Sequence, residues 1–292
     1  MLNPDISLLN DLESRIVVEL EKLGVFYRCF PRVKTSESLE KKIKSNPGKY
    51  SESGKKIQDF FGIRLTLYFD DDSYILQNIL KNKFSVDGTS IDKHDGNTFG
   101  PTRQNVVYHL PEDLSHREIS ISTNPLVDKT FEVQFRTIYS EGWHEIEHDL
   151  RYKRKQDWED HSDMDRTLNS IVASLENCDW MMLKIFDELS WRHYKSHNWE
   201  PMLRTKFRLR IENNPIDDHI LSILEENPIF AKDLFRISRK AFLEKLHECN
   251  ESLPLTLDLI IFVANYFFLR NPNVNKLIPL PYKEILSNGI AE

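Results

Sequence analysis

Cysteine is scarce in this sequence of 292 residues, which contains only Cys29, Cys178 and Cys249 and no CxxC pair. An odd number of widely separated cysteines is not typical of a disulfide framework or of a thiolate metal site. We therefore expect a protein of the reducing cytoplasm, without structural disulfides.

A long uninterrupted apolar run is also missing. The most apolar stretch, residues 253–269, contains Pro254, Asp258 and Asn265, whereas a membrane-spanning helix needs about 20 predominantly apolar residues. A buried helix is the better interpretation, and no membrane partner is expected. The N-terminus lacks a basic head followed by an apolar run and a cleavage site, so no signal peptide is expected.

An excess of positive charge is the third absence, since the net charge is -7. The chain therefore has no global attraction for nucleic acid, although a local basic site stays open. Its content of 40% hydrophobic and 29% charged residues is typical of a soluble globular protein. The length allows one large or two modest domains, each with its own core.

The most informative stretch runs from Thr130 to Lys153. Hydrophobic and polar residues alternate over residues 131–136, which predicts a β-strand with Glu132, Gln134 and Arg136 on one face. A turn and a helix follow. A strand whose polar face carries an acid, an amide and a base indicates a binding site.

Cations gather earlier in the chain, where a strand over residues 25–33 leads into a helix beginning near Glu37 and capped by Ser36. Arg32 and Lys34 share one face of the extended segment, and Ser38 and Lys42 face the same way on the helix. Such cations suit a polyphosphate, because several donors spread its charge. A solvated charged face is the alternative.

An acid and an arginine flank the next strand, which begins through Gly62. Asp59 precedes this strand and Arg64 lies on it, an arrangement that suits a Mg²⁺ ligand beside a guanidinium that stacks on a base or binds phosphate. An aspartate that caps a turn is the alternative. Before these elements the sequence predicts a helix over 5–24. After them come a helix over 73–83, a Gly- and Asp-rich region over 87–100, and strands over 105–110 and 118–122. The order predicts an α+β fold with a mixed sheet flanked by helices.

Three blocks of this sequence together resemble the synthetase domain of the RelA/SpoT family, most closely the small alarmone synthetases and their toxic relatives. The blocks are Arg32-Val-Lys34 with Ser38 and Lys42, then Asp59 with Gly62-Ile-Arg64, then Glu132-Val-Gln134-Phe-Arg136-Thr137 continuing to Trp143, Glu147-His148 and Tyr152-Lys153. The resemblance covers roughly residues 10–155 and implies a nucleotidyltransferase-like fold.

The resemblance implies a Mg²⁺-dependent pyrophosphokinase, which moves the β,γ-pyrophosphate of ATP to the 3'-hydroxyl of an acceptor nucleotide. Asp59 and Glu132 would then be the catalytic residues and the metal ligands. The implied ATP-binding residues are Arg32, Lys34, Ser38, Lys42 and Arg64, with the two arginines around the adenine. The implied acceptor-binding residues are Arg103, Asn105, Gln134, Arg136 and His148.

The chain departs from the family pattern in the acceptor loop. Family members carry a tyrosine that stacks on guanine, whereas the corresponding position here is Asn105 or Pro101, depending on the alignment. Loss of that platform removes about 1 to 3 kcal/mol of stacking. Arg103 would take part of the role. The departure favours the 3' end of tRNA as acceptor, as in toxic family members that block translation. One alternative is an alarmone synthetase that acts on free nucleotides. The other is a sensor that binds nucleotide or RNA without catalysis.

Two basic clusters would suit an RNA backbone, although a solvated helix face is the other interpretation. They are Arg151-Tyr-Lys153-Arg-Lys155 and Arg204-Thr-Lys206-Phe-Arg208-Leu-Arg210.

The helix after residue 137 also contains a formal zinc motif. His144, Glu145 and His148 satisfy HExxH, in which two histidines at i and i+4 bind Zn²⁺. A third ligand would have to come from Glu159 or His161. The RelA/SpoT pattern explains more of this helix, so His144 is interpreted as an ordinary surface histidine.

We expect residues 1–160 to form the pyrophosphokinase domain and residues 161–292 to form an all-α region. Predicted helices span 163–191, 217–226, 229–249 and 254–270, with Asn-Pro breaks between the later ones. This region is interpreted as a surface for homo-oligomers, a lid on the acceptor site or a contact for an antitoxin or regulatory protein. No HxxxH-Asp constellation of the family's hydrolase domain is present, which predicts synthesis without degradation.

Overall fold

The computed structural model describes residues 4–91, 104–116, 124–249 and 253–288. The chain divides into two compact units. The first consists of Met1–Val17 and Tyr27–Trp180, and the second of Val18–Phe26 and Met181–Glu292. Two helices, α1 (Pro4–Leu23) and α7 (Ser162–Lys195), contribute residues to both units.

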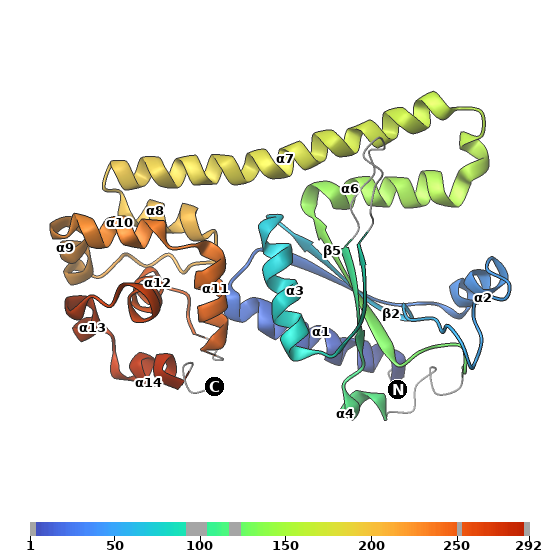
Figure 1. Cartoon of the computed structure of the whole chain (residues 1–292), viewed down its shortest axis with the longest axis horizontal. Helices are drawn as coiled ribbons and strands as arrows, with labels where there is room; N and C mark the ends of the chain where they lie inside the picture. Colours follow the sequence, from blue (N-terminus) through green and yellow to red (C-terminus); the bar gives the residue numbers. More distant parts are fainter. Residues whose placement is uncertain (1–3, 92–103, 117–123, 250–252, 289–292) are drawn as a thin grey trace. The chain divides into compact units, whose positions relative to one another are not determined.

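A five-stranded sheet is the centre of the first unit (Figure 1). Its strands are β1 (Tyr27–Val33), β2 (Phe61–Leu67), β3 (Val86–Ile91), β4 (Gln104–His109) and β5 (Thr130–Thr137). The order across the sheet is β1-β2-β5-β4-β3. Only β2 and β5 are parallel, and every other neighbouring pair is antiparallel. The prediction of an α+β fold with a mixed sheet is therefore confirmed.

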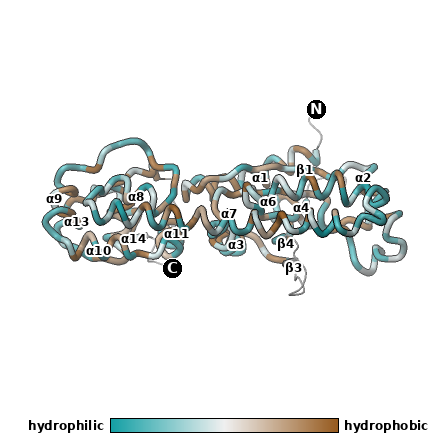
Figure 2. The backbone as a smooth tube through the Cα atoms, turned by 90° about the horizontal axis from the view of Figure 1, so that it is seen from above, coloured by the Kyte–Doolittle hydropathy of each residue, from teal (hydrophilic) through white to brown (hydrophobic). Residues whose placement is uncertain are grey.

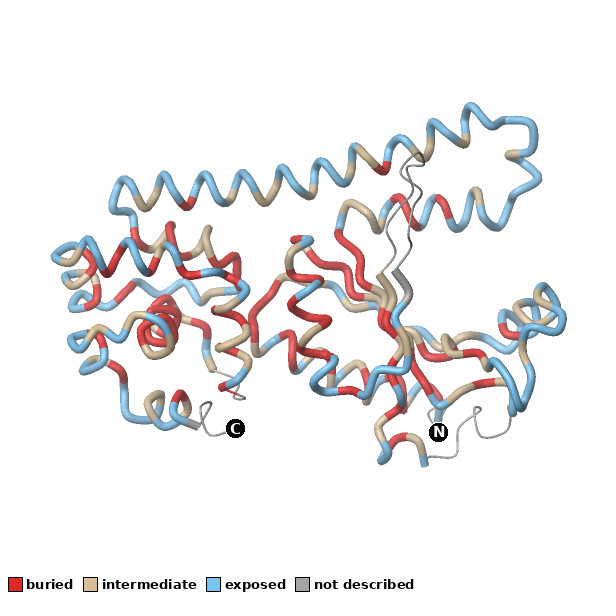
Figure 3. The backbone as a smooth tube through the Cα atoms, in the orientation of Figure 1, coloured by how far each residue is buried: buried red, intermediate tan, exposed pale blue. Residues whose placement is uncertain are grey.

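One face of the sheet is apolar and is covered by α1 and α3 (Asp71–Lys83). Phe84, directly after α3, contacts the rings of Tyr108 and Phe131 at centroid distances of 5.9 and 5.3 Å. Buried positions of this unit lie along β2 and β5 and also along α1 and α3 (Figure 3). Because side chains alternate along a strand, the polar residues between these apolar ones point to the opposite face. That opposite face carries the candidate site.

The helix after β5 begins with a capping box. The hydroxyl of Thr137 accepts from the backbone N–H of Ser140, and the Ser140 hydroxyl accepts from the N–H of Thr137. This cap fixes the start of α6 (Ile138–Ile146). The predicted helix does not continue regularly to Lys153, because a π-helix, η1 (Glu147–Arg151), and a 3-10 helix, η2 (Tyr152–Trp158), follow.

The second unit is built from helices alone among its described residues. They are α8 (Trp199–Phe207), α9 (Asp218–Glu226), α10 (Pro228–Arg236), α11 (Arg239–Glu248), α12 (Leu257–Ala264), η3 (Asn265–Leu269), α13 (Pro272–Leu277) and α14 (Leu280–Asn288). The prediction of one helix over 229–249 is wrong. The Ser238 hydroxyl accepts from the N–H of Ala241 and starts a new helix there.

Hydrophobic and hydrophilic positions are interspersed along the helices (Figure 2). Within the described residues, none of the helices combines the length and the hydropathy needed to cross a bilayer. The apolar stretch over 253–269 instead contains α12, whose residues are all buried apart from Asp258.

Two smaller elements of the first unit also differ from the predictions. The helix α2 (Ser36–Lys44) is capped by Thr35 rather than Ser36, because the Thr35 hydroxyl accepts from the backbone N–H of Ser38 at 3.2 Å. The Gly- and Asp-rich region over 87–100, for which no strand was predicted, begins as β3. The short helix α4 (Glu112–Ser115) precedes residues 117–123, so the strand predicted over 118–122 lies outside the described residues.

Candidate active site

Strand pairing aligns the polar residues of the open sheet face in two rows. In one row Arg32 on β1, Gly62 on β2 and Glu132 on β5 are register partners. In the next row Phe30, Arg64, Gln134 and Asn105 are partners. Adjacent strands lie about 4.8 Å apart, so residues far apart in the sequence meet here. Glycine at position 62 leaves the space between Arg32 and Glu132 open.

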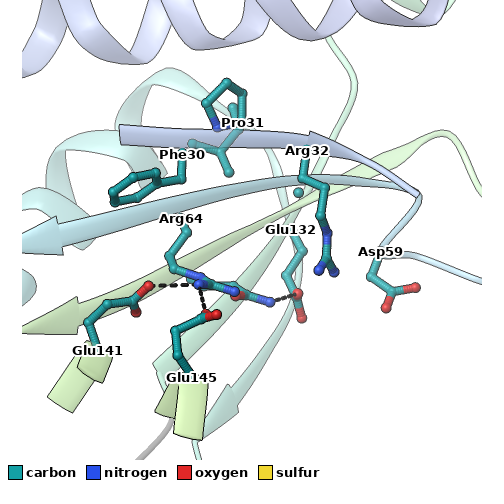
Figure 4. A pocket seen from close by; sticks show the side chains of 11 residues that line it. Phe30, Pro31, Arg32, Asp59, Arg64, Glu132, Glu141 and Glu145 are labelled. Atoms are coloured by element: carbon teal, nitrogen blue, oxygen red, sulfur yellow. Dashed lines mark hydrogen bonds and ion pairs between the residues drawn. The ribbon is translucent and has the colours of Figure 1, made fainter. Parts of the chain in front are cut away.

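A cavity of about 520 Å³ lies over these rows (Figure 4). Asp59 and Glu132, the two expected catalytic acids, both line it. The remaining lining residues come from β1, β2, β5 and α6: Phe30, Pro31, Arg32, Gly62, Ile63, Arg64, Gln134, Glu141 and Glu145. Both acids therefore face one cavity.

Asp59 binds Lys34 and Lys42, the two lysines that are expected to hold phosphates. The ammonium groups of Lys34 and Lys42 both donate to Asp59 Oδ2 at 2.7 Å. Asp59 Oδ1 is buried and has no hydrogen-bond partner among the described residues. A carboxylate with one oxygen shared by two cations and the other unsatisfied is suited to bind a further cation, because a buried polar atom without a partner is costly.

The lysine pair and Asp59 shift one another's pKa. Burial alone would raise the pKa of Asp59, but the charges and hydrogen bonds of Lys34 and Lys42 outweigh burial and lower it. Burial lowers the pKa of Lys34 despite the charge of Asp59. Burial also opposes the charged form of Lys42, yet the hydrogen bond and charge of Asp59 leave its pKa raised. Lys34 is therefore the lysine that loses its proton more easily.

Amide side chains hold both oxygens of Glu132. Asn105 donates to Oε1 at 3.1 Å, and Gln134 donates to Oε2 at 2.6 Å. Arg136 supports this pair from behind, since its guanidinium donates to Asn105 Oδ1 at 3.4 Å and to the backbone carbonyl of Phe135 at 2.9 Å. Glu132 is thereby fixed in orientation at the cavity wall. Asn105 belongs to this network and carries no aromatic ring.

Arg64 lies between two acids of α6 that the sequence analysis did not assign to this site. Its Nη1 group donates to Glu141 Oε1 at 2.7 Å and contacts Glu145 (Figure 4). Its Nε group is 3.4 Å from Gln134 Oε1. The spacing i, i+4 of the two acids on a helix that follows a site strand was a usable signal, but Glu145 was considered only within the HExxH pattern.

The lining of the cavity does not include six of the predicted site residues that the structure describes: Lys34, Ser38, Lys42, Asn105, Arg136 and His148. The Ser38 hydroxyl, in the first turn of α2, is 2.9 Å from the Thr35 hydroxyl. His148 lies on η1, where its Nδ1 is 2.9 Å from Asp149 and its ring stacks on Tyr152, so it does not line the cavity. Arg103 and Pro101 fall outside the described residues.

The HExxH pattern does not form a metal centre in the described part of the chain, where no group of three or more histidines, cysteines or acids could hold an ion. The interpretation of His144 as a surface residue is wrong. It is buried, with its ring edge-on to Trp143 at a centroid distance of 5.6 Å. Glu145, the base of the hypothetical zinc site, instead contacts Arg64.

Two cations of the basic cluster at residues 151–155, Arg151 and Lys153, are paired with acids. Arg151 donates to Asp165 at 2.9 Å and to Asn169 at 2.6 Å. Lys153 donates to Asp149 at 2.7 Å.

The second cluster, residues 204–210, is engaged in a similar way. Arg204 pairs with Glu200, Arg210 pairs with Glu21, and Arg208 is buried. In each cluster two of the cations are therefore engaged with acids.

The donor set fits Mg²⁺. This ion is commonly held by one or two carboxylates together with substrate phosphates and water, so Asp59 and Glu132 need no third acid. The unsatisfied Oδ1 of Asp59 and the fixed oxygens of Glu132 are the atoms that would hold it.

One known family and several solved structures are similar to this chain. The family described as the region found in RelA/SpoT proteins matches residues 31–157. Among solved structures, small alarmone synthetase 1 from Bacillus subtilis is 21% identical, with 62% of this chain and 92% of that chain covered and a TM-score of 0.47. The protein smu.1046c from Streptococcus mutans UA159 is 23% identical, with 64% and 94% covered and a TM-score of 0.49.

A GTP pyrophosphokinase family protein from Streptococcus pneumoniae is 22% identical, with 63% of this chain and 90% of that chain covered and a TM-score of 0.47. The comparison with curated proteins finds no match. The family match spans β1 to η2, and with it all the residues that line the cavity except Phe30. Residues 31–157 are therefore similar to the region found in RelA/SpoT proteins.

Proposed function

We propose that the chain is an ATP-dependent pyrophosphokinase that transfers the β,γ-pyrophosphate of ATP to a ribose 3'-hydroxyl. The observation that carries this proposal is the convergence of Asp59 and Glu132 on one cavity, with Lys34 and Lys42 bound to Asp59. Transfer of this type asks little covalent work of a protein, so that positioning and cations supply most of the rate enhancement.

Each residue then has a physical role. Lys34 and Lys42 neutralise the phosphates of ATP, and Arg32 and Arg64 hold its base. Bound Mg²⁺ would neutralise charge that develops on the phosphate oxygens. Glu132, held by Asn105 and Gln134, accepts the proton of the 3'-hydroxyl. The 3'-oxygen bonds to the β-phosphorus, the bond from that phosphorus to the α,β-bridging oxygen breaks, and AMP leaves.

For the acceptor we propose the 3'-terminal adenosine of tRNA. Neither candidate for the family's stacking tyrosine, Asn105 or Pro101, is aromatic, which supports this choice; Asn105 is in addition bound to Glu132 and Arg136. Without an aromatic platform, a free guanine nucleotide loses about 1 to 3 kcal/mol of stacking. A pyrophosphorylated tRNA end blocks aminoacylation, so the protein would act as a growth-inhibiting toxin.

The test is transfer of label from [γ-³²P]ATP in the presence of Mg²⁺, with tRNA, GDP, GTP and ADP in separate reactions. Label on tRNA together with an equal amount of AMP is expected. Label on a free nucleotide alone would make the protein an alarmone synthetase. No label on any acceptor would leave a sensor that binds nucleotide without catalysis. Growth arrest on expression, relieved by Asp59→Ala, is the matching result in cells.

A further inference from the structure

Arg64 is the most constrained cation of the cavity. Nη1 is bound to Glu141 and Glu145, and Nε is close to Gln134. These contacts use hydrogens on the edge of the planar guanidinium, whereas stacking on an aromatic ring uses a guanidinium face. Arg64 is therefore prepared to stack on a base.

The same two acids exclude phosphate from this end of the cavity. A phosphate beside Arg64 would meet the carboxylates of Glu141 and Glu145, and like charges at such distances repel. The opposite end has Lys34 and Lys42 around Asp59. Phe30, the register partner of Arg64 on β1, adds an exposed aromatic ring to the Arg64 end. A nucleotide therefore binds with its base toward α6.

Glu141 and Glu145 differ in what they can reach. The side chain of Glu141 is 17% exposed, and its second oxygen is shielded from solvent. Both acids line the cavity, but the side chain of Glu145 is 52% exposed. Glu141 is thus a tether for Arg64, whereas Glu145 keeps an oxygen accessible to a ligand.

A carboxylate only accepts hydrogen bonds. Adenine presents an amino group at C6, whereas hypoxanthine and guanine present a carbonyl oxygen there. A carboxylate that faces this carbonyl oxygen places two hydrogen-bond acceptors together without a donor. A site built to accept a hydrogen bond from the base therefore rejects an analogue that lacks the donor.

On these grounds we infer that Glu145 selects ATP by accepting a hydrogen bond from the 6-amino group of adenine, and that Glu141 is a positioning residue that holds Arg64 against the base. The inference rests on the proposed function, because it takes the cavity as the site of the pyrophosphate donor. It adds the residue that distinguishes one purine donor from another.

The experiment measures equilibrium binding to the full chain with Mg²⁺ and without acceptor. The probes are the β,γ-methylene analogue of ATP and the matching analogues of ITP and purine riboside triphosphate, which carry a carbonyl and a hydrogen at C6. The variants are Glu145→Gln and Glu141→Gln. Glu37→Gln is the control, because it removes one negative charge from an exposed position on α2.

Wild type and the control should bind the ATP analogue about tenfold to a hundredfold more tightly than the other two. An amide donates as well as accepts, so Glu145→Gln should bring the ATP and ITP analogues to within about threefold of each other. Glu141→Gln should weaken all three by a similar factor and leave their ratios unchanged, which separates positioning from selection.

Equal binding of all three analogues by wild type, or an unchanged ratio in Glu145→Gln, would overturn the inference while leaving the proposed function intact. Failure of wild type to bind any of the three would overturn the proposed function, and the inference with it.

Discussion

Asp59→Asn should abolish pyrophosphate transfer and at the same time tighten the binding of metal-free ATP. In the structure Lys34 and Lys42 each donate to Asp59 Oδ2 at 2.7 Å, and both must turn toward the phosphates when ATP binds. Asparagine keeps the shape of the side chain and removes its charge. The lysines are then no longer held by a competing anion.

The size of the effect follows from these two contacts. A hydrogen bond to a charged group contributes about 1.5 to 3 kcal/mol. The side chain of Asp59 is 25% exposed and that of Lys42 is 30% exposed, so solvent screens part of this energy. If about 1 to 1.4 kcal/mol is recovered on binding, the Kd for metal-free ATP falls about fivefold to tenfold.

With Mg²⁺ present, Asp59→Asn should no longer favour ATP binding, because the variant lacks its principal metal ligand. Several kcal/mol of transition-state stabilisation are lost, which lowers kcat by more than about a thousandfold. Binding is measured by calorimetry with EDTA and transfer by release of AMP. Glu37→Gln, which changes the net charge equally, is the control, and a thermal melt verifies the fold of each variant.

Two results would refute this reasoning. Weaker binding of metal-free ATP by Asp59→Asn would mean that Asp59 does not compete with the phosphates for the lysines. Transfer at an appreciable fraction of the wild-type rate would mean that Asp59 is not needed at the reacting end of ATP.

Three further predictions follow from titratable groups. Because burial lowers the pKa of Lys34, kcat/KM for ATP should fall as the pH rises toward the ordinary pKa range of lysine. Lys34→Arg should shift this fall to higher pH. An unshifted pH profile in the variant would contradict the role of Lys34. Burial raises the pKa of Asp179, which accepts from Thr137, from 3.8 to about 6. Because the folded state holds this proton more tightly, the free energy of unfolding falls as the pH rises from about 4 to about 6. Asp179→Asn should therefore raise the free energy of unfolding at pH 7 by about 1 to 2 kcal/mol. A denaturant titration that shows no gain would contradict this. Burial raises the pKa of the half-buried Cys29 to about 12 and that of the buried Cys249 to about 11, whereas Cys178 is exposed. A thiol reagent near neutral pH should therefore modify Cys178 first, and modification of Cys29 at the same rate would contradict this.

Much of the first unit could be predicted because its signals are local. The alternation in residues 131–136 predicts β5, and Gly24, with its positive φ of 64°, ends α1 as expected. The grouping of Arg32, Lys34 and Lys42 near Asp59 was accessible only through the resemblance. Spacing alone does not reveal which strands become neighbours, and β2 and β5 lie some 70 residues apart in the chain.

The elements that were missed depend on tertiary contacts or on competing caps. Asp87, Gly88 and Ser90 have low β propensity, and β3 forms because β4 supplies its hydrogen-bond partners. The break between α10 and α11 lies at Ser238, a cap inside a stretch that is otherwise helical in pattern. Glu141 and Glu145 become site residues only through Arg64 on another element. Sequence periodicity carries no information of that kind.

The most direct test of this account is a crystal structure of the protein with Mg²⁺ and a non-hydrolysable ATP analogue. The account predicts one Mg²⁺ with carboxylate oxygens of both Asp59 and Glu132 at about 2.0 to 2.1 Å, bound to the phosphates that Lys34 and Lys42 hold. A nucleotide in the cavity whose Mg²⁺ contacts neither acid, or only one of them, would contradict it.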